Sequence, residues 1–169
     1  MRIALDIDDV LADFMGAYKE YYHTDKFPNR LQSARITRNV QLLRKNKKFW
    51  TSLRVLNQLD FEPELYCTKR INPKRYTKQW LSSNGYPNKP VYQIYIQGFN
   101  KAERIKGKCD VLIDDSVRNV LQAINYGLPA ILYSTPENEG FDYPYRITSL
   151  KYHEIERVYN ELLNELKRF

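Results

Sequence analysis

Short apolar runs recur along the chain and are separated by longer segments in which apolar positions have helical spacing. The runs lie at residues 3–7, 64–67, 91–96, 110–113 and 130–133, with a shorter one around Tyr145 and Ile147. Continuous apolar runs of about four to eight residues are typical of strands buried on both faces of a parallel sheet. The pattern therefore predicts six strands.

The segments between the runs predict helices with identifiable ends. Asn72 is expected to cap a helix that begins at Pro73 and ends at Gly85. Ser116 is expected to cap a second helix that ends at Gly127. Further helices are expected at 101–106 and over 150–169. The apolar positions at helical spacing are Val117, Val120, Leu121 and Ile124 in the helix after Ser116, and Tyr152, Ile155, Val158, Tyr159, Leu162 and Leu166 in the last one.

Strands that alternate with helices indicate an α/β fold with a parallel sheet and right-handed crossovers. Residues 14–60 break the alternation, because they are rich in Tyr, Lys and Arg and predict two or three helices between the first and second strands. We therefore expect an α/β core made of residues 1–13 and 61–169, with a small basic helical cap, residues 14–60, inserted after the first strand.

The positive charge of the chain is unevenly distributed. The formal net charge is +7, and residues 14–60 contain ten Lys or Arg and three acidic residues, so the whole surplus lies in this segment. A second basic cluster without an acidic residue comprises Lys69, Arg70, Lys74, Arg75 and Lys78. Basic segments are usually solvated faces, but two that flank candidate site motifs suggest an anionic substrate or partner.

The composition limits which side chains can carry out a reaction and in which cellular compartment the protein is expected. Cys67 and Cys109 have no metal-ligand spacing, which favours reduced thiols in the cytoplasm. No apolar run reaches membrane-spanning length, and the N-terminus has no signal-peptide pattern, so we expect a cytoplasmic protein without a membrane partner. His23 and His153 are the only histidines and lie in unrelated contexts, which favours carboxylate over imidazole chemistry.

Asp6 and Asp8 come at the end of the first apolar run, two positions apart and so on one side of an extended backbone. Parallel α/β sheets hold their ligands at the carboxyl ends of the strands. Two adjacent carboxylates at a buried strand end repel each other by several kcal/mol at an effective dielectric of about 20. A divalent cation is the simplest way to offset this repulsion, and a solvated Asp-rich turn is the alternative.

Other element ends carry polar groups of a matching kind. Thr68 follows the second predicted strand, Asp114 and Asp115 follow the fourth, and Lys101 begins the helix before the fourth. In one parallel sheet these side chains can converge with the first aspartate pair on a single crevice. An N-cap role for Thr68 and a solvated position for Lys101 are the alternatives for each residue taken alone.

This order of motifs resembles the haloacid dehalogenase (HAD) superfamily of phosphatases over nearly the whole chain. The matching motifs are Asp6-x-Asp8-x-Val10, Thr68 after a strand, Lys101, and the apolar run that closes in Asp114-Asp115. The resemblance implies a HAD-like Rossmannoid parallel sheet, with Asp6 as the nucleophile and Asp8 as the acid/base. We expect the phosphate to be bound by Thr68, Lys69 and Lys101.

Within the superfamily the chain is most similar to the 5'(3')-deoxyribonucleotidases. The similarity rests on Asp8-Asp9-Val10-Leu11-Ala12-Asp13-Phe14, the Phe49-Trp50 pair and Ile113-Asp114-Asp115-Ser116, while Lys69 departs from the small hydroxyl residue that often follows the Thr. It implies a Mg²⁺-dependent phosphomonoester hydrolase that acts on a nucleoside monophosphate. The Mg²⁺ ligands would be Asp6, the backbone carbonyl of Asp8, Asp115, and Asp114 directly or through water.

The residue types by themselves, apart from the resemblance to the family, also fit phosphomonoester hydrolysis. A carboxylate such as Asp6 can attack phosphorus, while Asp8 protonates the leaving alkoxide and then activates a water molecule. Phe49 and Trp50 fit either the core of the insert or an apolar wall for a nucleobase. Two other functions stay open: a phosphatase of phosphorylated nucleic-acid ends, and a non-catalytic nucleic-acid-binding module on the same fold.

Overall fold

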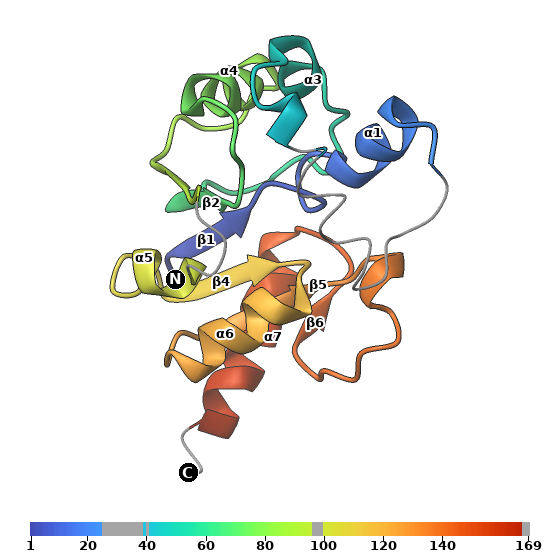
Figure 1. Ribbon diagram of the computed structural model, residues 1–169. Coiled ribbons are helices and arrows are strands. Elements are labelled where there is room, and N and C mark those ends of the chain that lie inside the picture. Colours follow the sequence, from blue (N-terminus) through green and yellow to red (C-terminus); the bar gives the residue numbers. More distant parts are fainter. Residues whose placement is uncertain (25–38, 40, 96–99, 167–169) are drawn as a thin grey trace.

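The computed structural model describes residues 1–24, 39, 41–95 and 100–166. Six parallel strands form one sheet at the centre of the molecule (Figure 1). The strands are β1 Ile3–Asp6, β2 Leu65–Thr68, β3 Val91–Gln93, β4 Val111–Asp114, β5 Ala130–Tyr133 and β6 Arg146–Ile147. The prediction of an α/β fold with a parallel sheet is confirmed.

The strand order is β3-β2-β1-β4-β5-β6, which is a Rossmann-like arrangement. The chain builds one half of the sheet outward from β1 to β3, and then crosses back to place β4 on the other side of β1. The order therefore reverses between β1 and β4. Open α/β sheets bind ligands in the crevice at such a point, outside the carboxyl ends of the strands.

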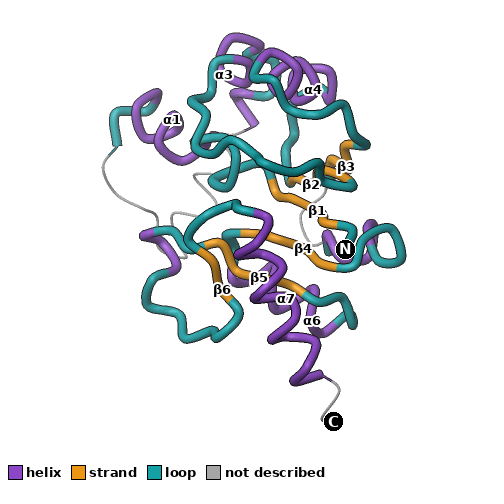
Figure 2. The backbone as a smooth tube through the Cα atoms, turned by 180° about the vertical axis from the view of Figure 1, so that it is seen from behind, coloured by secondary structure: helices purple, strands orange, loops and turns teal. Residues whose placement is uncertain are grey.

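Helices cover both faces of the sheet (Figures 1 and 2). The helices are α1 Phe14–Tyr21, α3 Lys47–Thr51, α4 Lys74–Ser83, α5 Lys101–Ile105, α6 Val117–Asn125 and α7 Tyr152–Leu166, with a 3₁₀ turn η1 at Pro136–Asn138. Leu5 and Ile113 belong to the hydrophobic cluster that contains Trp80 of α4 and Ile155 of α7. Ala4 and its neighbours on the opposite sheet face form a second cluster with α5 and α6.

The two ends of the segment between β1 and β2 meet beside the sheet. Ala12 pairs with Val55 in an antiparallel bridge, and the Asp13 carboxylate lies 2.7 Å from the guanidinium of Arg54. Helix α3 of this segment packs beside α4, where the indole N–H of Trp80 donates to the Leu53 carbonyl at 2.7 Å (Figure 1). Two helices of the expected cap are thus described, and residues 25–38 and 40 lie outside the described residues.

Some predicted helix and strand details are confirmed and others are wrong. Ser116 caps α6 through its hydroxyl, and Gly85 and Gly127 follow their helices with positive φ angles of 76° and 73°. Leu121 and Leu166, which were expected on buried faces, are 42% and 51% exposed. They lie at the edges of apolar faces whose centres are buried. Strand β3 is shorter than expected, and Ile96 lies outside the described residues.

The predicted N-cap at Asn72 is wrong. Helix α4 begins at Lys74 with Pro73 in the cap position and without a capping side chain. The Asn72 side chain is fully buried, and its amide donates to the Thr77 hydroxyl at 3.3 Å and to the Pro73 carbonyl at 3.2 Å. This amide therefore stabilises the turn before α4 in place of the helix N–H groups. Among the described helices none is long and apolar enough to cross a membrane.

Candidate active site

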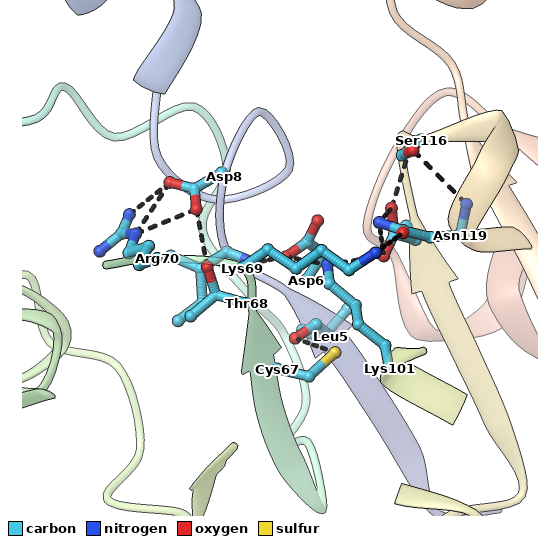
Figure 3. Close-up of polar contacts among 12 residues, drawn as sticks. Leu5, Asp6, Asp8, Cys67, Thr68, Lys69, Arg70, Lys101, Ser116 and Asn119 are labelled. Carbon is cyan, nitrogen blue, oxygen red and sulfur yellow. Dashed lines mark hydrogen bonds and ion pairs between the residues drawn. The ribbon is translucent and has the colours of Figure 1, made fainter. Parts of the chain in front are cut away.

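The carboxyl ends of β1, β2 and β4 bring the predicted polar residues to one side of the sheet (Figure 3). Asp6 ends β1, Thr68 ends β2 and Asp114 ends β4, and all three are buried. The Lys101 side chain reaches the same point from the first residue of α5. Asp6, Asp114 and Lys101 meet where β1 lies beside β4, while Thr68 lies on the other side of β1, where it contacts Asp8.

Lys101 lies between two carboxylates. Its ammonium nitrogen is 2.7 Å from Asp6 Oδ1 and 2.8 Å from Asp114 Oδ2, and only 1% of the residue is exposed. Burial alone would lower the pKa of Lys101, but the charges of Asp114 and Asp6 outweigh it and raise this pKa well above its usual value. Lys101 is therefore a fixed positive charge in the site, and the solvated alternative is wrong.

The aspartates of this group are crowded. Asp6, Asp114 and Asp115 each offer a carboxylate oxygen, and these oxygens lie within 4.8 Å of one another. Burial, followed by the charge of Asp114, raises the pKa of both Asp6 and Asp115 well above the usual range. When all three carboxylates are ionised, the one ammonium leaves two negative charges unbalanced. A hard divalent cation such as Mg²⁺ would offset these charges and favour the ionised forms, so the donor set fits such an ion.

Asp8 faces away from this group and toward β2 (Figure 3). The Thr68 hydroxyl donates to Asp8 Oδ2 at 2.7 Å. The guanidinium of Arg70 holds the same carboxylate through Nε at 2.9 Å and Nη2 at 2.7 Å, both to Oδ1. Asp8 thus contributes no carboxylate to the aspartate group, although it comes from the same strand end as Asp6.

Arg70 is a site residue that sequence reasoning assigned only to a basic surface cluster. It is 1% exposed, and its guanidinium carbon lies 5.3 Å from the centre of the Trp50 ring. Its Nη1 has no hydrogen-bond partner among the described residues. Arg70 therefore connects the candidate acid/base Asp8 to the α3 helix of the insert. A basic residue two positions after Thr68 was the only signal in the sequence.

Asn119 is a second residue that sequence reasoning missed. Its amide donates to both carboxylate oxygens of Asp114, at 3.0 and 3.1 Å, and its carbonyl oxygen accepts from the Lys69 ammonium at 2.7 Å. The backbone N–H of Ser116 donates to Asp114 Oδ1 at 2.9 Å. Asn119 thus fixes the orientation of the Asp114 carboxylate and places the exposed Lys69 ammonium over the site (Figure 3).

Lys69 is influenced by the buried ammonium beside it. Partial burial, followed by the positive charge of Lys101, lowers the pKa of Lys69 below its usual value.

A tight loop after β1 sets the direction of these side chains. The N–H groups of Leu11 and Ala12 donate to the Ile7 carbonyl at 2.9 and 2.8 Å, and Asp9 has a φ of 57°. The Asp9 carboxylate accepts from the Met15 N–H at 2.8 Å, and burial raises its pKa to about 7. Asp9 therefore has a structural role, in which it holds a left-handed turn between the strand and α1.

This role predicts different effects for two substitutions of Asp9. Asp9→Ala should lower the free energy of unfolding by about 1–3 kcal/mol, because Ala disfavours a positive φ and cannot accept the Met15 N–H. Asp9→Asn should cost less than about 1 kcal/mol, since Asn tolerates the left-handed region and keeps an acceptor oxygen. Urea denaturation measures both, and equal losses would contradict the role of the backbone angle.

Phe49 and Trp50 lie in the core of the insert. Trp50 is 1% exposed, its ring stacks on Phe14 with centroids 5.6 Å apart, and its indole N–H donates to the Leu43 carbonyl at 2.9 Å. Phe49 is 7% exposed and packs edge-on against Phe14 and Trp50. Of the two alternatives for Phe49 and Trp50, the position in the core of the insert is therefore the one observed, and neither ring forms an open wall for a nucleobase.

The assembled site can hold a cation at three carboxylates and an oxyanion near Lys101, with a further carboxylate, Asp8, on the opposite side of the crevice. Asp6 lies between these two parts at the end of β1 (Figure 3). Comparison with known proteins adds no assignment: no protein-family model matches the chain, and no curated protein matches it.

Proposed function

We propose that this protein is a Mg²⁺-dependent phosphomonoester hydrolase of the HAD type, with the segment between β1 and β2 as its cap. The observation that supports this most is the buried set of Asp6, Asp114 and Asp115 around Lys101 at the switch point of the sheet. A structural ion pair needs only one carboxylate for one ammonium. The two remaining negative charges favour a site that receives a cation and a phosphate.

The residues that would hold Mg²⁺ are Asp6, Asp114 and Asp115. When bound, the ion would draw charge from the phosphoryl oxygens and balance the carboxylates. Lys101, whose ammonium lies between Asp6 and Asp114, would neutralise another phosphoryl oxygen as a preorganised buried donor. The Thr68 hydroxyl, one strand away on β2, would break its hydrogen bond to Asp8 and donate to the phosphate instead. The exposed Lys69 ammonium can reach the phosphate from solvent.

The reaction follows from Asp6 at the end of β1 and Asp8 two residues after it. The Asp6 carboxylate attacks phosphorus, and the bond from phosphorus to the ester oxygen breaks. Once the Thr68 hydroxyl has turned to the phosphate, the Asp8 oxygen that it releases carries the proton that goes to the leaving alkoxide, while Arg70 holds the other oxygen. Asp8 then removes a proton from water, which attacks the aspartyl-phosphate, and inorganic phosphate leaves with Asp6 restored. Arg70 is a positioning residue here, because it fixes the orientation of the Asp8 carboxylate.

A nucleotide is the substrate class that the resemblance to deoxyribonucleotidases favours. The buried positions of Phe49 and Trp50 make a stacked base at these rings less favourable than the sequence suggested. Phe49 does border a surface pocket of about 430 Å³ together with Tyr21 and Lys48. None of the residues that line this pocket belongs to the candidate active site, so a nucleoside monophosphate stays the proposed substrate on the resemblance alone.

The direct test is phosphate release from p-nitrophenyl phosphate by the purified chain. We expect turnover with Mg²⁺ and none with EDTA. Mg²⁺ should also raise the melting temperature of the wild-type protein, and this shift should shrink in Asp115→Asn, which loses one ligand. Absence of both turnover and a Mg²⁺-dependent shift would exclude the proposed function, whereas a shift without turnover would leave only a metal site.

The role of Asp8 predicts a dependence on the leaving group. Asp8→Asn should slow the hydrolysis of an alkyl phosphate by about 10²–10⁴-fold, because the alkoxide then leaves without a proton. An aryl phosphate, whose leaving group needs little protonation, should lose much less. The measurement is kcat/KM for both substrates, and equal losses would assign Asp8 to positioning only. Arg70→Met should reproduce the same asymmetry in a weaker form if it orients Asp8.

A further inference from the structure

A basic groove runs along the edge strand β3, between α4 on one face of the sheet and α5 on the other. Its volume is about 540 Å³, and the side chains that give it its character are those of Lys74, Lys78, Tyr92, Tyr95 and Arg104. Strand β3 is the outermost strand on this side of the sheet. No other strand of the described residues therefore covers the groove on this side.

The charge of the groove has one sign. Lys74 and Lys78 lie one turn apart on α4, Arg104 faces them from α5, and none of the described lining residues is acidic. All three side chains are exposed. Neither lysine forms an ion pair with another described residue. These lysines belong to the second basic cluster of the sequence, of which Lys69 and Arg70 lie at the candidate active site.

Two tyrosines lie between these cations. Tyr95 is 50% exposed, and Tyr92 is partly buried, with the Lys108 ammonium 5.2 Å from the centre of its ring. An exposed aromatic ring in a positively charged groove can stack on a base of any sequence, while the cations contact the phosphates. A double helix cannot present its bases in this way, because they are paired and stacked.

The groove leads to the candidate active site. Gln93 of β3 pairs with Thr68 of β2, which lies next to β1 and Asp6. Neighbouring strands are about 5 Å apart, so the end of the groove is about 10 Å from the end of β1. The Gln93 amide also donates to the Arg70 carbonyl at 3.1 Å. A chain seated along β3 would thus end near the proposed phosphate site.

We propose that this groove binds a single-stranded nucleic acid, with Lys74, Lys78 and Arg104 on phosphates and Tyr95 under a base. The binding surface stands on its own geometry and charge. Its consequence for substrate choice rests on the function proposed above: the terminal phosphate of a bound strand is presented to Asp6. The substrate class is then a phosphorylated strand end in addition to a mononucleotide.

The binding test uses a fluorescent single-stranded DNA of about twelve nucleotides, within the usual range of site sizes. Anisotropy is measured in EDTA, so that no turnover occurs, at about 50–300 mM salt. The logarithm of the association constant should fall against log salt with a slope of about 2, or about 0.7 for each of three phosphate contacts. In Lys74→Ala/Lys78→Ala the slope should fall to about 0.7, with affinity about 25-fold lower at about 0.1 M salt.

A matched control removes two exposed lysines from the basic insert, in Lys45→Ala/Lys47→Ala. This variant should keep the wild-type slope, and an equal loss in it would place the binding on the insert and overturn the proposal. Tyr95→Ala should weaken single-stranded binding about fivefold or more and leave the salt slope unchanged. Equal competition by polyglutamate of the same charge would indicate an acidic peptide as the partner and would also overturn it.

Catalysis provides a separate result. If the wild-type protein hydrolyses p-nitrophenyl phosphate with Mg²⁺ but does not bind the strand, the groove proposal fails and the proposed function stands. If it binds the strand in a manner that depends on Lys74 and Lys78 but hydrolyses nothing, the binding surface stands and the enzyme does not. If both hold, kcat/KM for a terminally phosphorylated oligonucleotide should fall more steeply with salt than kcat/KM for the aryl phosphate.

Discussion

Asp6→Asn is expected to abolish the Mg²⁺-dependent hydrolysis of any phosphomonoester, with a loss of roughly 10⁴-fold or more in kcat. The amide cannot attack phosphorus and form an aspartyl-phosphate, and the substitution also removes one of the three carboxylates that would hold the ion. The variant should still fold, because an amide is less costly than a carboxylate to bury at a position 4% exposed. Phosphate release from an aryl phosphate measures this loss.

The matched control is Asp110→Asn, which makes the same chemical change just before β4. Asp110 lies at the opposite end of that strand, where its carboxylate is 2.8 Å from the guanidinium of Arg2. Activity in this variant should stay close to that of the wild type. Near-normal turnover in Asp6→Asn, with Mg²⁺ present and the protein folded, would eliminate Asp6 as the nucleophile.

Lys101→Met is expected to cause the largest loss of stability, about 3–5 kcal/mol in the free energy of unfolding. Met keeps much of the buried side-chain volume but removes the charge that lies 2.7 Å from Asp6 and 2.8 Å from Asp114. Two buried carboxylates are then left without their ammonium, and burial of an unpaired charge is costly. Urea denaturation at neutral pH without Mg²⁺ gives the loss directly.

Lys45→Met is the control for this prediction. It removes an exposed lysine of the insert and should change the free energy of unfolding by less than about 0.5 kcal/mol. A similarly small change in Lys101→Met would mean that the aspartates take up protons and remain buried in neutral form without difficulty. Addition of Mg²⁺ should recover part of the lost stability in Lys101→Met if the carboxylates form a cation site.

The sequence by itself determined the strands and most of the helices. Strands β1, β4 and β5 are buried on both faces, so each appears as a continuous apolar run that cannot be mistaken for a solvated segment. The placement of Asp6, Thr68 and Asp114 also followed from the sequence. In a parallel sheet, all strand ends that follow an apolar run point to the same edge, whichever order the strands take.

Only the tertiary structure decided which partner each polar side chain has. Asp6 and Asp8 are close in sequence, but one contacts Lys101 and the other contacts Arg70, and both partners are distant in the chain. Hydrophobic periodicity reports which residues are buried and carries no information on such pairs. Asn72 shows a related limit: its buried amide donates to the Pro73 carbonyl and the Thr77 hydroxyl in place of capping the helix, and its backbone carbonyl accepts from the side chain of Gln93 on β3.

The burial of Arg70 and Trp50 has the same physical origin. An arginine in a basic cluster is usually solvated, and it can be buried only where a carboxylate offsets the loss of water. That carboxylate, Asp8, comes from the loop after β1, and the aromatic ring over Arg70 comes from the insert. These three segments meet only when the sheet is assembled and α3 packs beside α4, so the contact between insert and site is a property of the tertiary structure.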